Sequence, residues 1–326
     1  MQIYYIIAIV IAAVVALLFI LALLCDFAAF GKRCDINPAL KYFSAEHFGL
    51  SAREVEVSRG IKGFIYRGNC VQNGQALVFC HGLGPGHVAY MTEIAYFCNL
   101  GYTVLAADSR GCNYSDGKNL KGMYSGAKTV MCAIDFVRRN EELFSESAAE
   151  CPKIYLVGHS WGGYSALAAS ARRKVDGVVA ISAPLSPSKT VSFSAAKIIT
   201  KPLAFILTPF LALINFIKFG AAGNANAARC AKINSAPTLL VHGDNDYIVP
   251  VGLSAFGKAE GENITKYCVK GKAHNPYNTQ NAERLLAELY AELKKGVKDF
   301  SEFDFKAATE EDAEVMDYIA RFLENN

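Results

Sequence analysis

A serine between two glycines is the feature of this sequence that most directly indicates chemistry. The motif Gly158-His159-Ser160-Trp161-Gly162 separates an apolar run at residues 154–157 from a stretch that favours a helix. In that context the motif forms a tight, strained turn that holds the serine hydroxyl at the edge of a sheet. Without the context, the same motif would fit an ordinary turn. The sequence therefore predicts that Ser160 is a catalytic nucleophile.

The predicted nucleophile needs a base, because a serine hydroxyl is a weak nucleophile at neutral pH. The sequence contains six histidines, and only His242 and His274 follow Ser160. In proteins with this turn the partners follow in the order serine, acid, histidine. His242 ends an apolar run just before the acidic candidates, so the order leaves His274 as the predicted base. The alternative is that His274 is an ordinary surface histidine.

An acid must orient that base, and few candidates exist. The aspartates between Ser160 and His274 are Asp176, Asp244 and Asp246. Asp176 stands at the start of an apolar run, which places it at the wrong edge of a sheet. We favour Asp246, because the acid must project from the loop beyond the strand towards the histidine. Asp244 is the alternative, and it would otherwise brace the turn.

Acyl transfer also needs donors for the developing oxyanion, each worth about 10²–10³-fold in rate. The amide that follows the nucleophile belongs to Trp161. The second donor is expected in the loop after an earlier strand, where the sequence reads His81-Gly82-Leu83-Gly84. We therefore predict an oxyanion hole formed by the amides of Leu83 and Trp161. Leu83 could instead only form a wall of the pocket.

The elements that position these residues follow from short apolar runs. Such runs stand at residues 76–79, 103–107, 154–157, 177–181 and 238–241, mostly separated by helical stretches such as 124–139. This alternation is typical of parallel strands that are joined by helices and buried on both faces. Before them, residues 55–57 and 63–66 indicate half-exposed antiparallel strands. Leu83, Ser160 and Asp246 each follow one of these runs, and His274 follows one more strand-like run at residues 264–269. These loops stand at the carboxyl edge, where α/β proteins place their sites.

Residues 186–234 interrupt the alternation and are too long for a connection. We predict a helical cap inserted between two strands. Its apolar block at residues 197–219 is broken by Pro202 and Pro209, which indicates two short helices. The cap could contact substrate or only pack on the domain. A membrane span here is disfavoured, because it would separate Ser160 from its two partners.

A second apolar run, at residues 3–25, carries no charge. As a helix it would be roughly 35 Å long, against a hydrocarbon core of roughly 30 Å, so it can span a bilayer. A cleaved signal peptide is disfavoured, since the run is long and no basic residue precedes it. We expect residues 1–30 to be a transmembrane anchor with its flank and residues 31–326 to be the catalytic domain. Lys32, Arg33 and Lys41 follow the run, which predicts a cytoplasmic domain.

Charge and composition exclude other classes of function. The formal net charge is +3, and the basic residues are scattered, which argues against a nucleic-acid binder. The ten cysteines lack the close pairs typical of metal ligands. This spacing gives no indication of a metal site.

Several motifs together resemble the α/β-hydrolases of the lipase, esterase and serine-aminopeptidase-like group, over residues 63–323. These motifs are the nucleophile turn, the loops at residues 81–84, 101–105, 108–111 and 115–117, and the segment at residues 242–250. The resemblance implies a mostly parallel sheet of about eight strands with helices on both faces. It also implies that Asp246 is the triad acid and His274 the base, while Asp108 and Arg110 belong to a structural turn. The resemblance implies no metal and no organic cofactor.

The expected activity is hydrolysis of a carboxylic ester with a hydrophobic or lipid-like acyl group, through an acyl-enzyme. The expected partners are this small-molecule acyl substrate and the lipid bilayer. A thioesterase or a peptidase for small substrates could use the same triad. A catalytically silent, membrane-tethered binding protein is the alternative of a different class, and a complete triad argues against it.

Overall fold

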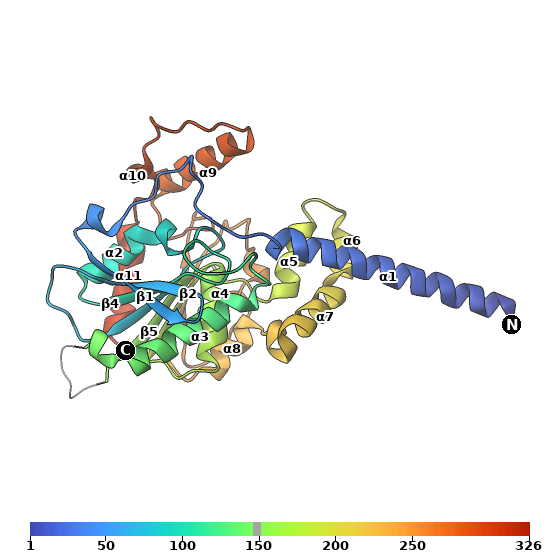
Figure 1. Cartoon of the computed structure of the whole chain (residues 1–326), viewed down its shortest axis with the longest axis horizontal. Helices are drawn as coiled ribbons and strands as arrows, with labels where there is room; N and C mark the ends of the chain where they lie inside the picture. The colour runs from blue at the N-terminus through green and yellow to red at the C-terminus, as the bar shows by residue number, and fades with distance from the viewer. Residues whose placement is uncertain (146–150) are drawn as a thin grey trace.

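The computed structural model describes residues 1–145 and 151–326. Its strands are β1 (Ser51–Ser58), β2 (Ile61–Arg67), β3 (Ala76–Cys80), β4 (Thr103–Ala107), β5 (Ile154–His159), β6 (Gly177–Ile181), β7 (Thr238–Gly243) and β8 (Ile264–Val269). Within the described residues they form an eight-stranded sheet in the order β1-β2-β4-β3-β5-β6-β7-β8 (Figure 1). Strand β2 is antiparallel to both of its neighbours, and the pairs from β4 to β8 are parallel. The predicted mostly parallel sheet is confirmed.

Helices cover both faces of this sheet. The α-helices are α1 (Gln2–Phe30), α2 (Met91–Asn99), α3 (Tyr124–Arg139), α4 (Trp161–Ser170), α5 (Pro187–Ala195), α6 (Lys201–Ile206), α7 (Thr208–Phe219), α8 (Ala227–Ile233), α9 (Gln280–Lys294), α10 (Phe305–Ala308) and α11 (Ala313–Glu324). The 3₁₀ helices are η1 (Ala45–Phe48), η2 (Gly86–Tyr90), η3 (Glu141–Leu143), η4 (Gly220–Asn224) and η5 (Val251–Leu253). Residues of α3, α4 and α8 form a core on one face, and residues of α2 and α11 form a core on the other.

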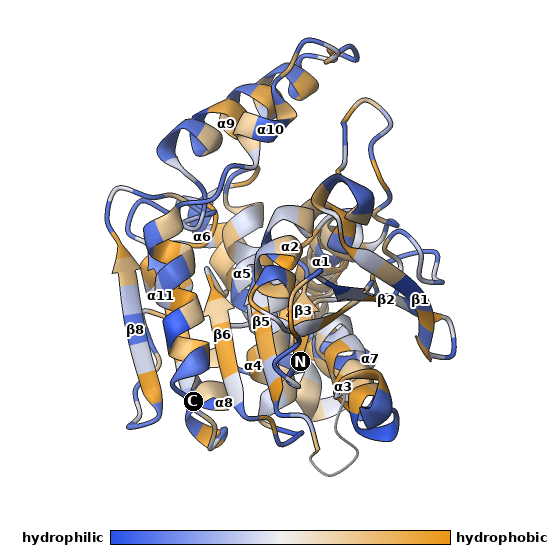
Figure 2. Ribbon diagram, turned by 90° about the vertical axis from the view of Figure 1, so that its left-hand side faces the viewer, coloured by the Kyte–Doolittle hydropathy of each residue, from blue (hydrophilic) through white to orange (hydrophobic). Residues whose placement is uncertain are grey.

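The central strands are apolar throughout because both of their faces are buried. In β3, for example, Val78 and Cys80 belong to one core while Leu77 and Phe79 belong to the other. Successive side chains of a strand point to opposite faces, so a strand between two layers of helices needs an apolar residue at every position. Figure 2 shows β5 and β6 in mainly hydrophobic colours, whereas the outer strand β1 carries hydrophilic residues. The same packing aligns the carboxyl ends of β3 to β8 at one edge.

The long segment between β6 and β7 is helical, as predicted. Helices α5, α6, α7 and α8 lie there, and the apolar block forms the two short helices α6 and α7. We call residues 186–234 the insertion. A stretch within it, Lys201–Ile233, is long and apolar enough to cross a membrane, but it is divided among α6, α7, η4 and α8. In its most apolar 18-residue segment, 28% is buried.

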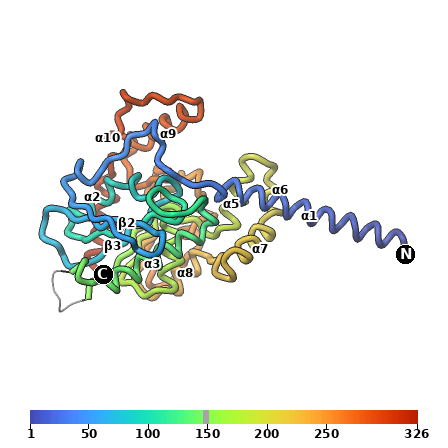
Figure 3. Tube along the Cα trace, in the orientation of Figure 1, coloured from blue at the N-terminus to red at the C-terminus, as the bar shows by residue number. Residues whose placement is uncertain are grey.

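Helix α1 is the other candidate span, and it projects away from the domain (Figures 1 and 3). Only 6% of the most apolar 18-residue segment of this helix is buried. The carboxyl-terminal part of the helix is different, because Ala22 and Phe30 are buried there and the helix contacts α5 and α7. The length and composition of α1 fit a membrane span or a signal sequence.

Candidate active site

Ser160 lies in a strained turn between β5 and α4. Its backbone has φ 54° and ψ −117°, a conformation that costs a non-glycine residue of the order of 1–3 kcal/mol. The turn is closed by close backbone approaches. A Cβ on Gly158 would lie 2.5 Å from the backbone of Gly162, and a Cβ on Gly162 would lie 1.8 Å from the carbonyl oxygen of Cys80. The glycines of the motif are therefore required by packing, and the strain presents the serine side chain at the sheet edge.

The structure brings together the three residues predicted as a triad. The Nε2 atom of His274 lies 2.9 Å from the Oγ of Ser160, and its Nδ1 lies 2.8 Å from the Oδ2 of Asp246. These side chains come from three loops, after β5, β7 and β8, that meet at the carboxyl edge of the sheet. The arrangement can remove a proton from the serine and stabilise the resulting imidazolium.

Backbone donors fix the carboxylate of Asp246. Its Oδ1 accepts hydrogen bonds of 2.8 Å from the amides of Ile248 and Val249, which leaves Oδ2 for His274. Burial alone would raise the pKa of this carboxyl, but the hydrogen bond and charge of His274 and the Val249 amide lower it below its ordinary value. Asp246 is therefore ionised at neutral pH.

Asp244 has a different partner. Its Oδ1 accepts a hydrogen bond of 2.7 Å from the amide of Gly271, which braces the turn after β8. His242 also lies near the acid: its Nε2 is 3.6 Å from the Oδ2 of Asp246 but only 2.9 Å from the carbonyl oxygen of Val249. The geometry thus separates the two aspartates that the sequence left as alternatives.

The two predicted oxyanion donors come from different segments, the start of α4 and the loop after β3. Trp161 is the first residue of α4, so its amide belongs to the helical turn that has no acceptor within the helix. Its indole Nε1 is buried and donates to the carbonyl oxygen of Met123 at 2.6 Å. Leu83 lies in the loop after β3, and 54% of its surface is exposed.

Tyr90 and His159, which the sequence did not single out, connect the loops after β3, β5 and β8. The Oη of Tyr90 accepts a hydrogen bond from the amide of Gly82 at 3.1 Å and lies 3.0 Å from the Nδ1 of His159. The Nε2 of His159 in turn lies 2.9 Å from the carbonyl oxygen of His274. Burial lowers the pKa of His159 to about 3, so the ring is neutral. One tautomer satisfies all three contacts, with Tyr90 donating to Nδ1 and Nε2–H donating to the carbonyl.

We call this series of hydrogen bonds, from Gly82 through Tyr90 and His159 to His274, the strut. It joins the loop of the predicted oxyanion donor, the nucleophile turn and the loop of the predicted base. His159 stands beside Ser160 in the motif, but the order of triad residues excluded it as a base, and the sequence offers no other signal for it. Tyr90 has no sequence signal.

A second buried contact holds the loop after β3 against the loop after β4. Asp108 accepts hydrogen bonds of 2.8 Å from both the amide and the Nδ1 of His87. The amide of Ser109 donates to the Nε2 of His81 at 2.9 Å. Asp108 therefore has the structural role that its motif implies.

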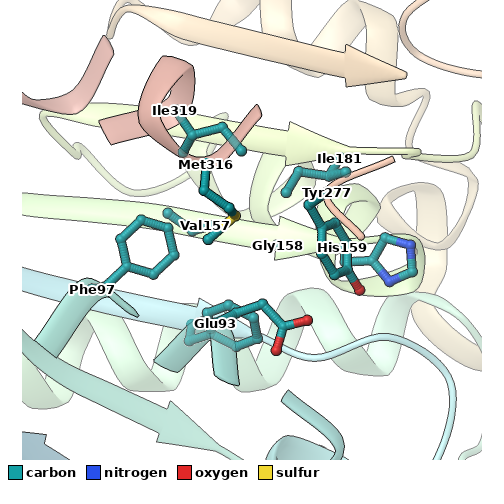
Figure 4. Close-up of a pocket in the computed structure, with 10 residues that line it drawn as sticks. Glu93, Phe97, Val157, Gly158, His159, Ile181, Tyr277, Met316 and Ile319 are labelled. Carbon is teal, nitrogen blue, oxygen red and sulfur yellow. The ribbon is translucent and has the colours of Figure 1, made fainter. Parts of the chain in front are cut away.

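A small cavity lies behind the strut, between the sheet and helices α2 and α11 (Figure 4). Figure 4 shows Glu93, Tyr277 and His159 on its polar side, with apolar side chains such as Met316 opposite. Burial raises the pKa of the Glu93 carboxyl to about 7. Burial and the Glu93 charge likewise raise the pKa of Glu311. Within the described residues, no three metal-ligating side chains gather as a metal site would require.

Comparison with known proteins identifies the fold. The model of the α/β hydrolase fold family matches residues 75–201. The structure of the esterase Pf2001 from Pyrococcus furiosus aligns with a TM-score of 0.58 at 18% identity, over 81% of this chain and 98% of the esterase. The α/β hydrolase GrgF from Penicillium sp. sh18 aligns with a TM-score of 0.51 at 20% identity, over 76% of this chain and 98% of GrgF. No curated protein sequence matches this chain. These similarities show that the chain has the α/β-hydrolase fold.

Proposed function

We propose that this chain is a serine hydrolase that cleaves carboxylic esters through an acyl-enzyme, with Ser160, His274 and Asp246 as its catalytic triad. The observation that carries the proposal is the continuous hydrogen-bonded series from Asp246 through His274 to Ser160, with the serine held on a strained turn. A purely structural serine would not need a strained backbone that aims its hydroxyl at a histidine.

The proposed reaction has two halves. In the first, His274 takes the proton of Ser160 as its Oγ attacks the ester carbonyl, and the oxyanion is held by the amides of Leu83 and Trp161. The tetrahedral intermediate collapses, and His274 gives the proton to the leaving alcohol. In the second half, His274 takes a proton from water, hydroxide attacks the acyl-enzyme, and the acid leaves as the proton returns to Ser160.

A hydrophobic acyl substrate fits the surface around the site. Leu83, Tyr247 and Ile248 are large apolar or aromatic side chains beside the predicted oxyanion hole and acid, and all three are exposed. Exposed apolar groups next to a reactive centre favour substrates with matching apolar groups. Pf2001, which has the same fold, is described as an esterase, and this supports ester chemistry for the present chain. Thioester and amide hydrolysis on the same triad are alternatives that a substrate series separates.

We further propose that α1 is an uncleaved span that holds the domain at the cytoplasmic face of a membrane. The support is the uncharged run at residues 3–25 and the basic residues that follow it.

Labelling with a fluorophosphonate tests the proposed nucleophile. The purified full chain in detergent should label, and Ser160→Ala should abolish both labelling and hydrolysis of short nitrophenyl esters. Ser194→Ala, which removes an exposed serine of α5, is the matched control and should behave like the unchanged protein. Full labelling of a folded Ser160→Ala variant would overturn the mechanism. An unchanged chain that neither labels nor turns over esters, thioesters or amides would favour the catalytically silent binding protein.

A further inference from the structure

The part of α1 that stands free of the domain is too short to cross a bilayer by itself. Every residue from 3 to 17 is exposed, whereas residues 18, 19, 21 and 22 are partly or fully buried. A helix over residues 3–17 is about 22 Å long, against a hydrocarbon core of about 30 Å. If α1 spans, about 8 Å of hydrocarbon must surround the part of α1 that is already packed on the domain.

The insertion packs against one side of that part of α1. Helices α5 and α7 contact α1, and Lys218 of α7 forms an ion pair with Asp26. Figure 1 shows α1 leaving the domain on the side where α6 and α7 lie. The ion pair places the end of α7 level with Asp26, four residues or about 6 Å along the axis from Ala22. If α1 spans a bilayer, the insertion therefore lies at the boundary between hydrocarbon and headgroups.

The outward surface of the insertion is apolar. In α7, Leu211, Ile214 and Asn215 are buried, while the opposite stripe remains exposed. The exposed apolar residues of α6, α7 and the segment before them are Ile198, Phe205, Ile206, Leu213, Phe216 and Ile217. Positions 213, 216 and 217 follow the spacing of one helix face. Ile217 is 67% exposed and Ile198 is 87% exposed, values that are unfavourable for such side chains in water.

The positive charge of the insertion favours an anionic lipid surface over a neutral partner. Residues 186–234 contain six lysines and arginines and no aspartate or glutamate. Since the whole chain carries +3, the remaining residues carry −3. Lysines beside an exposed apolar stripe are typical of helices that lie in the headgroup region of anionic membranes, with the apolar face about 5–10 Å deep. That depth agrees with the missing 8 Å of the span.

We infer that α6 and α7 form a membrane-contact surface that lies in the anionic headgroup boundary of the bilayer that α1 spans. The inference rests on the proposed span. This arrangement would also bring the membrane close to the proposed active site. Lys197 lies in the segment between α5 and α6, and its Nζ donates to the carbonyl oxygen of Tyr247 at 3.2 Å. Tyr247 follows Asp246, so the segment that leads into the membrane-contact surface touches the acid loop through one side chain.

Tryptophan reporters in the full chain test this surface. The chain has a single tryptophan, Trp161, which is buried and gives a constant background. Ile206→Trp and Ile217→Trp place reporters on the surface, and Leu17→Trp places one on the exposed part of α1. Val71→Trp is the control, because residue 71 lies in the loop after β2, at the opposite end of the sheet from the proposed site.

Each variant is reconstituted in phosphatidylcholine and phosphatidylglycerol vesicles, with and without lipids brominated near the headgroup end of the acyl chain. We expect the reporters at 206 and 217 to show blue-shifted emission that brominated lipid quenches, and the reporter at 71 to show neither. Lys201→Glu should weaken the quenching of the reporter at 217, while Lys294→Glu, on exposed α9, should not.

The outcomes separate the inference from the proposed span. Quenching at 17 with none at 206 and 217 would overturn the membrane-contact surface and leave the span intact. No quenching at 17 would overturn the span itself and, with it, the inference. A blue shift at 217 that depends on protein concentration and not on brominated lipid would mean that a second copy of the chain covers this surface.

Discussion

Replacing Asp246 with asparagine tests the role of the acid most sharply, because its two oxygens have different partners. Oδ1 accepts from the amides of Ile248 and Val249, so the carbonyl oxygen of an asparagine would keep that position. The side-chain NH₂ would then point at Nδ1 of His274, where Oδ2 now lies 2.8 Å away. Since that NH₂ is a donor, the histidine would have to carry its proton on Nε2.

A histidine protonated at Nε2 cannot accept the proton of Ser160. The corresponding change in serine proteases lowers kcat by about 10⁴-fold, or about 5.4 kcal/mol in activation free energy, while the geometry is preserved. We expect a loss of this size for Asp246→Asn, with KM nearly unchanged. The assay is steady-state hydrolysis of a short soluble ester, with circular dichroism and thermal unfolding to show that the variant is folded.

Asp244→Asn is the matched control, because it makes the same chemical change two residues away. The asparagine oxygen can still accept from the amide of Gly271, so we expect nearly unchanged kcat and a stability loss of at most about 0.5–1.5 kcal/mol. Equal losses of kcat in both variants, or a larger loss in Asp244→Asn, would refute the assignment of Asp246.

Two further changes probe the surroundings of the site. Tyr90→Phe removes the hydroxyl that links Gly82 to His159, so it should lower kcat by up to about a hundredfold with little change in KM. Tyr96→Phe removes a hydroxyl of α2 that donates to Asp317 instead, and it should leave kcat nearly unchanged. A purely structural Tyr90 would lower stability alone, which unfolding measurements on the same samples would show. Burial raises the pKa of the Glu93 carboxyl from 4.5 to about 7, so the folded state gains stability from this proton below pH 4.5 and loses it as the pH rises through 7. Glu93→Gln should therefore flatten the fall in melting temperature over that range, and an unchanged slope would show that Glu93 titrates normally.

The strands and the order of the site residues could be predicted from the sequence because their signals are local. The apolar runs at residues 103–107 and 177–181 coincide with β4 and β6, since a strand buried on both faces must be apolar at every position. The turn at Ser160 could be recognised because only glycine fits where Gly158 and Gly162 touch neighbouring backbone. The sequence also placed His274 in the loop after β8, where the structure has it.

Contacts between distant segments were decided only by the tertiary structure. Asp244 and Asp246 are the same residue type two positions apart, and only the direction of each side chain separates the partner of His274 from the brace of Gly271. Tyr90 acquires its role because α2 and η2 bring its hydroxyl to His159, 69 positions away. The packing of α1 on the insertion depends likewise on Asp26 meeting Lys218, 192 positions away. Such pairs leave no periodic signal, because their distance in space depends on the path of every element between them.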